Sequence, residues 1–541
     1  MSETNNKARE TALQAWNAYQ PRPTSIVKYQ SSGLVAVVAG IDAWKGLDEL
    51  TAPLRKLGVI TASASAVSGH RDAVATAGRA IEMSGHLGAF ELRLKGEGGS
   101  ETLRADIVLD MGDEPLCTRE LPPPGYLYAN PSETTPEAVV EQLLDMTGEF
   151  EKPRFFNYQP DICAHGVNGA VVCTRCIDAC PADAISSTGA VIEVDPNLCQ
   201  GGGVCATVCP SGAIQYALPS RSDSGNRLRK MLQAYLEAAG ERPVVLFHAA
   251  SCELDKALRS MANLLPNPVE EIASVGMDLC LSALVYGADQ VLLLVDEEAP
   301  KGSIWHLQRE IKWAHDLLQG LGIDKSRLQL VRQGQHIDWL DTPIRITPAV
   351  YSMPDNKRQA IFQAVDHLYQ QLDDVQESVD LPVGAPFGSA SINADSCTLC
   401  MACVGACPGR ALQDGSNRQA PEVFFIESNC LQCGACTLTC PENAISITPR
   451  LVLDRETRNQ ARMLNQDTPF ACISCGKPFA PSSVIHKMTF RLQGHHMFQS
   501  GRALDRLKMC ENCRVADIVQ DDEAMNGQFD PLESLARNRL P

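Results

Sequence analysis

The stretch that decides the fold is CTLCMACVGACPGRAL, residues 397–412. Its cysteines follow the spacing Cys-x2-Cys-x2-Cys-x3-Cys-Pro, which returns at residues 430–441. The closing phrase, Cys-Pro-x-x-Ala followed by Ile or Leu, occurs as CPADAI at 180–185, CPSGAI at 209–214, CPGRAL at 407–412 and CPENAI at 440–445. These copies fall into two pairs, so the chain contains the same cysteine-rich unit twice.

The second of these units, residues 386–450, is complete. A loop with three closely spaced thiolates surrounds three irons of a cubane cluster, while the cysteine before proline reaches the neighbouring cluster. The spacing resembles that of the bacterial two-cluster ferredoxins, which implies an α+β ferredoxin-like module with two [4Fe–4S] clusters. By this resemblance one cluster is held by Cys397, Cys400, Cys403 and Cys440, and the other by Cys430, Cys433, Cys436 and Cys407.

The first unit, residues 155–220, departs from the pattern in its first run. Ala170 stands where the leading cysteine is expected, and the run then continues as Cys173-x2-Cys176-x3-Cys180. A cysteine further upstream can return to the same cluster through a longer loop. We therefore predict a [4Fe–4S] cluster held by Cys163, Cys173, Cys176 and Cys209.

The second run of this unit, LCQGGGVCATVCP at 198–210, has Gly202 where its second cysteine is expected. The ligands that remain in register are Cys180, Cys199 and Cys205. Seven-iron ferredoxins, which this half resembles, hold a [3Fe–4S] cluster when that ligand is not cysteine. Three possibilities stay open: a [3Fe–4S] cluster, a [4Fe–4S] cluster completed by water, another group or a displaced cysteine such as Cys117, and an empty site.

The 22 cysteines and the net charge of −18 constrain the class of protein. Disulfide scaffolds are small and secreted, whereas cysteines at Cys-x2-Cys spacing in a reducing compartment bind metal. The polar start MSETNNKARE lacks an apolar secretory stretch, so we expect a cytoplasmic protein. An acidic chain does not favour phosphate backbones, and no apolar run reaches the roughly 18 residues of a membrane span. Redox proteins are therefore the expected partners, without nucleic acid or a membrane span.

Residues 31–150 are predicted to form an α/β domain. GLVAVVAG (33–40) and ADIVLDMG (105–112) are apolar runs typical of buried strands, and LDELTAPLRKLG (47–58) has helical spacing. Thr135 and Pro136 are expected as the cap and first residue of a further helix. No GxGxxG follows the first strand, so the sequence does not support a dinucleotide-binding fold.

Residues 221–385 are predicted to form a parallel sheet covered by helices. The expected strands are 242–250, 269–276, 289–296 and 327–331, and the expected helices are 252–264, 278–287, 303–321 and 356–372. GADQVLLLV followed by LGIDKSRLQLV resembles the delta subunit of methyl-viologen-reducing hydrogenase, which passes electrons to heterodisulfide reductase. That family carries a [2Fe–2S] centre, but Cys252 and Cys280 are too few to hold one. We expect a docking or spacing role here, with both cysteines in the core.

Residues 451–541 contain two further cysteine pairs, Cys472-x2-Cys475 and Cys510-x2-Cys513. Four thiolates at this spacing suit tetrahedral zinc in a closed structural site, which predicts a zinc-ribbon-like tail. Rubredoxin-type iron uses the same four sulfurs and stays open as an alternative. The second pair lacks the glycine of a rubredoxin loop, which favours zinc.

The sequence thus predicts a multi-domain α/β protein with two α+β ferredoxin-like modules, a C-terminal metal domain and a polar N-terminal tail at 1–30. The whole chain resembles iron–sulfur proteins that accompany formate dehydrogenases. This resemblance implies a non-catalytic subunit that relays electrons between a formate dehydrogenase or hydrogenase and a second acceptor. The alternatives are an enzyme that uses an open-corner cluster as a Lewis acid, and a scaffold or maturation factor for iron–sulfur clusters.

Overall fold

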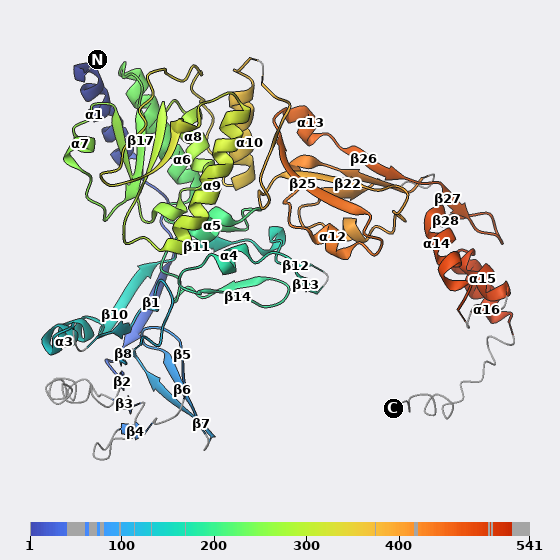
Figure 1. The fold of residues 1–541 in the computed structure, drawn as a ribbon, viewed down its shortest axis with the longest axis horizontal. Coiled ribbons are helices and arrows are strands. Elements are labelled where there is room, and N and C mark those ends of the chain that lie inside the picture. The colour runs from blue at the N-terminus through green and yellow to red at the C-terminus, as the bar shows by residue number, and fades with distance from the viewer. Residues whose placement is uncertain are drawn as a thin grey trace. The chain divides into compact units, whose positions relative to one another are not determined.

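The computed structural model describes residues 2–39, 60–63, 73–75, 80–96, 99–112, 114–130, 133–167, 169–373, 375–415, 420–495, 498 and 501–521. The chain divides into two compact units, Met1–Val379 and Asp380–Pro541 (Figure 1). Strand β21 (Ser378–Asp380) contains the boundary between them. The expected helix at 47–58 lies outside the described residues. The finer division into six segments stays a prediction.

The first unit begins with a helix that the sequence analysis does not anticipate. Helix α1 (Ser2–Ala18) packs against α6 (Arg221–Glu237). Ala8 and Ala12 are fully buried, and the guanidinium of Arg227 lies 3.2 Å from the ring centre of Trp16. A few small apolar residues among many polar ones are enough to bury one narrow helix face, so the expectation of a polar tail at 1–30 is corrected to a docked helix.

The N-terminal α/β region has a parallel sheet with the order β4-β3-β2-β8-β9. Its strands are β2 (Val35–Ala39), β3 (Ile60–Ser63), β4 (Ala73–Ala75), β8 (Ile107–Met111) and β9 (Tyr126–Tyr128). The expected strands at 33–40 and 105–112 are therefore present as β2 and β8. Helix α3 (Pro136–Asp145) starts as predicted, because the Thr135 hydroxyl accepts a hydrogen bond from the backbone N–H of Ala138.

Two antiparallel elements accompany this sheet. A three-stranded sheet is formed by β5 (Ala80–Ser84), β6 (Phe90–Gly96) and β7 (Gly99–Ala105). A ribbon is formed by β1 (Ile26–Ser31) and β10 (Gly148–Pro153), paired in antiparallel register. Figure 1 shows this ribbon running between the N-terminal sheet and β11 (Phe156–Tyr158), the first strand of the next region.

The first ferredoxin-like module is made of short strand pairs and two short helices. Strand β11 pairs with β16 (Ile214–Tyr216), so the two ends of the module meet. The remaining elements are β12 (Gly166–Val167), β13 (Ala170–Val171), α4 (Arg175–Asp178), β14 (Ile185–Ser187), β15 (Ile192–Val194) and α5 (Val204–Val208), with a 3-10 turn at Pro160–Ile162.

The third region of this unit has a parallel sheet with the order β18-β17-β19-β20. Its strands are β17 (Val244–Ala249), β18 (Leu264–Val269), β19 (Gln290–Val295) and β20 (Leu328–Arg332). Its helices are α6, α7 (Lys256–Arg259), α8 (Met277–Val285), α9 (Lys301–Gly320) and α10 (Lys357–Tyr369), with 3-10 turns at Ile272–Ser274 and Lys325–Arg327. The parallel sheet with covering helices is as the sequence predicts.

Two predictions for this region are wrong in detail. The strand expected at 269–276 ends at Val269, and the helix expected at 252–264 is reduced to α7. The strand observed here, β18, contains Pro266 and Pro268, and proline residues normally indicate that a segment is not a strand. Because β18 is the edge of its sheet, the missing N–H groups of these prolines need no partner strand.

The second unit contains the second ferredoxin-like module and the tail. An antiparallel pair, β22 (Gly388–Ile392) and β25 (Ile445–Val452), and the sheet β23-β24-β26 enclose the module. The other elements of the module are β23 (Leu412–Asp414), β24 (Glu422–Phe425), β26 (Arg462–Gln466), α11 (Ala402–Gly405), α12 (Ala435–Thr439), α13 (Arg455–Asn459) and a 3-10 turn at Glu427–Asn429. The tail comprises β27 (Pro469–Ala471), β28 (Pro478–Pro481), α14 (Ser482–Leu492), α15 (Gly501–Leu507) and α16 (Glu511–Val519).

Candidate iron–sulfur and metal centres

In the second module, four predicted ligands surround one cavity. Cys397, Cys400, Cys403 and Cys440 all line it. The remaining wall is mainly apolar, with Ile392, Val423 and Ile445 among its residues. Burial and the neighbouring cysteines raise the pKa of Cys403 to about 11. A cavity that gathers four thiols among apolar side chains has the donor set of a [4Fe–4S] cluster.

The other four cysteines of this module also approach one another. Cys433 interacts electrostatically with Cys407 and Cys430, and Cys436 interacts with these three. Burial, followed by these neighbours, raises the pKa of Cys436 to about 12. Buried thiols crowded in this way ionise only when a cation compensates their charge, and the irons of a cluster supply that cation. Both sets in this module therefore fit the group that the spacing predicts.

The backbone of the cysteine loops repeats as closely as the sequence does. In three loops, the second and fourth residues after the leading cysteine have positive φ angles. These residues are Gly201 and Gly203, Leu399 and Met401, and Gln432 and Gly434. In all four Cys-Pro-x-x-Ala phrases, the residue before alanine also has a positive φ: Asp183, Gly212, Arg410 and Asn443. The loop that contains Gly202 thus has the same conformation as the two complete cluster loops.

The alanine of the repeated phrase has a definable role. The N–H groups of Ala184, Ala411 and Ala444 donate hydrogen bonds to the sulfurs of Cys180, Cys407 and Cys440, at 3.3, 3.2 and 3.3 Å. Hydrogen bonds to the sulfurs stabilise thiolate ligands and tune cluster potentials. In the fourth phrase, the N–H of Ala213 is directed to the hydroxyl of Ser211 instead.

In the first module, the structure brings Cys163 together with the other three cysteines predicted to share its cluster. Cys163, Cys173, Cys176 and Cys209 line one cavity. His165 also lines it but is otherwise engaged: its Nδ1 donates to the carbonyl of Cys173, and its Nε2 lies 2.7 Å from the Ser187 hydroxyl. His165 therefore holds the loop between Cys163 and Cys173 in place, so that the longer connection still returns a thiol to this cavity.

The three remaining cysteines of this module line a separate cavity. Cys180, Cys199 and Cys205 all line this one cavity. Burial, then the two neighbouring cysteines, raises the pKa of Cys205 well above its ordinary value. Gly202 contributes to the wall, as its place in the repeat predicts. The site is thus formed and has three thiols in place of four.

The three glycines of this loop differ in what they require. Gly201 and Gly203 have φ angles of +83° and +71°, and a Cβ at Gly203 would lie 2.5 Å from the Cβ of Ser274. Gly202 has no positive φ, and a Cβ there would meet nothing closer than Pro181 at 3.4 Å. Leu399 and Met401 adopt such φ angles in the Cys397 loop, so it is the close approach of Phe155 to Gly201 and of Ser274 to Gly203 that leaves no room for a side chain there. Position 202 has room for a cysteine.

Leu121 of the proline-rich connector lies beside the fourth corner of this cavity. Leu121 and Pro181 line the cavity beside Gly202, and the N–H of Leu121 donates to the carbonyl of Pro181. The amide of Gln200 donates to the carbonyl of Pro122 at 2.6 Å. Cys117 is not among the residues that line the cavity; it packs beside Phe90 and Tyr126 in the N-terminal core, and its N–H donates to the Tyr126 hydroxyl. This placement does not support Cys117 as the displaced ligand.

The strand ribbon of the N-terminal region touches this three-cysteine loop, which sequence reasoning did not find. The Nζ of Lys152 donates to the carbonyls of Asn197 and Cys199, at 2.8 and 2.7 Å. The Tyr29 hydroxyl donates to the same Asn197 carbonyl at 2.6 Å. Burial lowers the pKa of Lys152 to about 8, while Cys199 and Asp195 oppose that shift.

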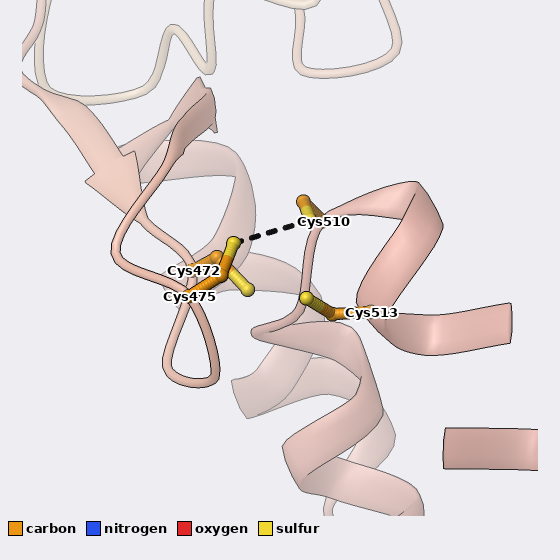
Figure 2. A group of neighbouring side chains, drawn as sticks. All are labelled: Cys472, Cys475, Cys510 and Cys513. Atoms are coloured by element: carbon orange, nitrogen blue, oxygen red, sulfur yellow. Dashed lines mark hydrogen bonds between the residues drawn. The ribbon is translucent and has the colours of Figure 1, made fainter. Parts of the chain in front are cut away.

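The tail brings its four cysteines together (Figure 2). The sulfurs of Cys472, Cys475, Cys510 and Cys513 all lie within 4.8 Å of one another. The sulfurs of Cys475 and Cys510 are 3.7 Å apart, and tetrahedral zinc with Zn–S bonds of about 2.3 Å needs about 3.8 Å. Burial disfavours the Cys472 thiolate, but N–H groups of Cys510, Cys475 and Ser474 directed at it lower its pKa to about 6. This geometry fits a tetrahedral metal ion.

The two cysteine pairs of the tail stand on different elements. Cys472 and Cys475 lie in the turn between β27 and β28, which ends at Gly476 with φ +72°. Cys510 caps α16, and Cys513 lies in its first turn. The second pair therefore starts a helix instead of a second hairpin, because it lacks the glycine that a tight turn requires.

Cys252 and Cys280 take no part in these centres among the described residues. Cys280 lies in α8 and is fully buried, as predicted for a core residue. Cys252 packs at the edge of the cluster formed around Leu246, Leu258 and Leu292. Neither lines any of the three cysteine cavities or joins the tail group.

Comparison with known families agrees with this geometry in two places. Residues 395–445 match the 4Fe-4S dicluster domain, and residues 192–215 match the 4Fe-4S binding domain. The second match contains the loop with Gly202. No curated protein matches the chain significantly. The two domains support an iron–sulfur electron-transfer protein. No helix in the described part of the chain is long and apolar enough to cross a membrane.

Proposed function

We propose that this protein is a non-catalytic subunit that relays electrons through four iron–sulfur clusters between an oxidoreductase and a second acceptor. The observation that carries the proposal is the repetition of one cluster-loop conformation in both ferredoxin-like modules, including the loop with Gly202. Bound clusters supply one-electron transfer, and the chain's residues supply ligands, hydrogen bonds to sulfur and walls that exclude water. The partner that we propose is of the formate dehydrogenase or hydrogenase type, on the resemblances described for the whole chain and for residues 221–385.

For the site with three cysteines we propose a [3Fe–4S] cluster. Three thiols in register around one cavity, and a fourth corner at which no further cysteine lies among the described residues, favour this assignment. Cys117, which the sequence offers as a replacement ligand, is directed into another core. For the tail we propose zinc, which fastens the turn between β27 and β28 to the start of α16.

The Lewis-acid alternative requires substrate to reach an open iron corner. The residues that face this corner, Leu121 and Pro181, are apolar and offer neither an acid nor a base. Among the described residues that line this cavity, Gln200 alone besides the cysteines has a polar side chain, and its amide donates a hydrogen bond to the carbonyl of Pro122. These observations favour electron transfer over substrate turnover at this cluster.

The proposal is tested on the anaerobically purified full chain. Metal analysis is expected to find about 15 irons and one zinc. A purified partner enzyme with its substrate should reduce the clusters reversibly, while the chain alone turns over no substrate. Eight irons or fewer contradict the four-cluster relay, and rapid transfer of intact clusters to an apo-ferredoxin supports the scaffold alternative instead. Capture from native cells then identifies the partner.

A further inference from the structure

Two side chains of the β1–β10 ribbon form hydrogen bonds with the start of the three-cysteine loop. Tyr29 on β1 and Lys152 on β10 both donate to the carbonyl of Asn197, and Lys152 also donates to the carbonyl of Cys199. The ammonium of Lys152 lies 4.9 Å from the ring centre of Tyr29. A half-buried cation is thereby fixed beside a predicted cluster ligand.

The charge of Lys152 is not cancelled by an ion pair. Among the described residues, no carboxylate lies within ion-pair distance of its Nζ. Its favourable electrostatic interactions are with Cys199 and, more weakly, Asp195. Lys28 on the paired strand β1 differs from Lys152 in burial and in charge compensation. Its side chain is exposed, and it forms an ion pair with Glu151 at 3.0 Å.

A lysine also lies at the start of a cysteine loop in the second module, the loop that opens with Cys397, but its charge is neutralised. The Nζ of Lys487 donates to the carbonyl of Ser396, next to Cys397, but it also forms an ion pair with Glu442. Glu442 lines the cavity of the Cys397 set. The two modules therefore both place a lysine at the start of a cluster loop, and only in the first is the positive charge uncompensated.

We propose that Lys152 is a positioning residue that raises the reduction potential of the cluster held by Cys180, Cys199 and Cys205. This inference rests on the proposed function, because it requires a cluster at that site. Reduction adds one electron to the cluster from an external donor and breaks no bond. A fixed positive charge at a partly buried site stabilises the more negative, reduced form, so the potential rises.

The test is a redox titration of the fully loaded chain, followed by EPR at pH 7 with dithionite as the reductant. Lys152→Met keeps the aliphatic stem and removes the charge, and Lys152→Gln also keeps a hydrogen-bond donor. Both are expected to lower the potential of the three-cysteine cluster and to leave the other clusters unchanged. Lys152→Arg should retain the wild-type potential, and Lys28→Met is the matched control on the paired strand, with no expected shift.

The possible results distinguish a failure of this inference from a failure of the proposed function. An unchanged potential in Lys152→Gln, with the cluster present, overturns the inference and leaves the relay intact. Loss of this cluster in both neutral variants means that Lys152 acts on folding alone, which also overturns it. Absence of any cluster at this site in the wild type contradicts the proposed function.

Discussion

The loop with Gly202 and the loop with Cys400 are the same structure with one ligand exchanged. Both have positive φ angles at the second and fourth positions, and both line a cavity with the cysteine of a Cys-Pro phrase. They differ in exposure, since Cys400 is exposed whereas Gly202 is partly buried beside Leu121 and Pro181. The comparison shows that a loop can lack one of its cysteines and still line a cavity with the others, when its backbone conformation is the same.

The largest expected effect comes from removing a second thiol from the incomplete set. Cys205→Ala would leave only Cys180 and Cys199, and two thiolates cannot retain three irons. We expect the loss of about three irons per chain and of the whole EPR signal of this cluster. Iron analysis of the purified variant measures the effect. Cys280→Ala, at a buried cysteine outside the cavities, serves as the control and should keep all irons.

We expect a smaller loss of iron when the Cys397 loop is given a glycine at the position that corresponds to Gly202. Cys400→Gly removes one ligand from the exposed side of the Cys397 set and leaves the other three in place. The expected result is the loss of about one iron and a second [3Fe–4S] signal in the oxidised protein. Complete loss of this cluster would show that the two loops are not equivalent and that the first module has a further ligand.

The smallest effect concerns the glycines of the incomplete loop. Gly203→Ala places a Cβ at a positive φ against Ser274, and we expect a cost of about 1–3 kcal/mol in the stability of the first module. Gly202→Ala is the matched control, with no positive φ and no contact below 3.4 Å, and should be close to neutral. Urea unfolding monitored by cluster absorbance compares the two. Equal losses would contradict the different roles assigned to these neighbouring glycines.

Much of the site could be predicted because its information is local. The Cys-x2-Cys spacings and the repeated Cys-Pro phrase place the ligands on loops of fixed conformation, so the groups around Cys397 and Cys163 assemble without any knowledge of the remaining chain. The centre of the sheet in residues 221–385 was also predictable, because β17 and β19 are mainly apolar and buried along their whole length. Cys163 could be predicted as a replacement for the cysteine missing at Ala170, because the spacing of Cys173, Cys176 and Cys180 fixed the register.

The rest depends on contacts between residues far apart in the sequence. Lys152 and Tyr29 reach the Cys199 loop only because β1 pairs with β10, and the alternation of polar and apolar residues in these strands says nothing about what they touch. Cys117 lies four residues before Leu121, which lines the cavity, yet Cys117 packs into a different core. Helix α1 and the proline-containing strand β18 were missed because tertiary packing overrode weak local signals.

The most direct test of the central claim is EPR of the fully loaded, oxidised chain, with Gly202→Cys as its counterpart. The account predicts a [3Fe–4S] signal in the wild type that disappears in Gly202→Cys as the chain gains about one iron, because the cavity accepts a side chain at this position. A fully loaded wild type without this signal, or a Gly202→Cys variant that keeps it unchanged, would contradict the account.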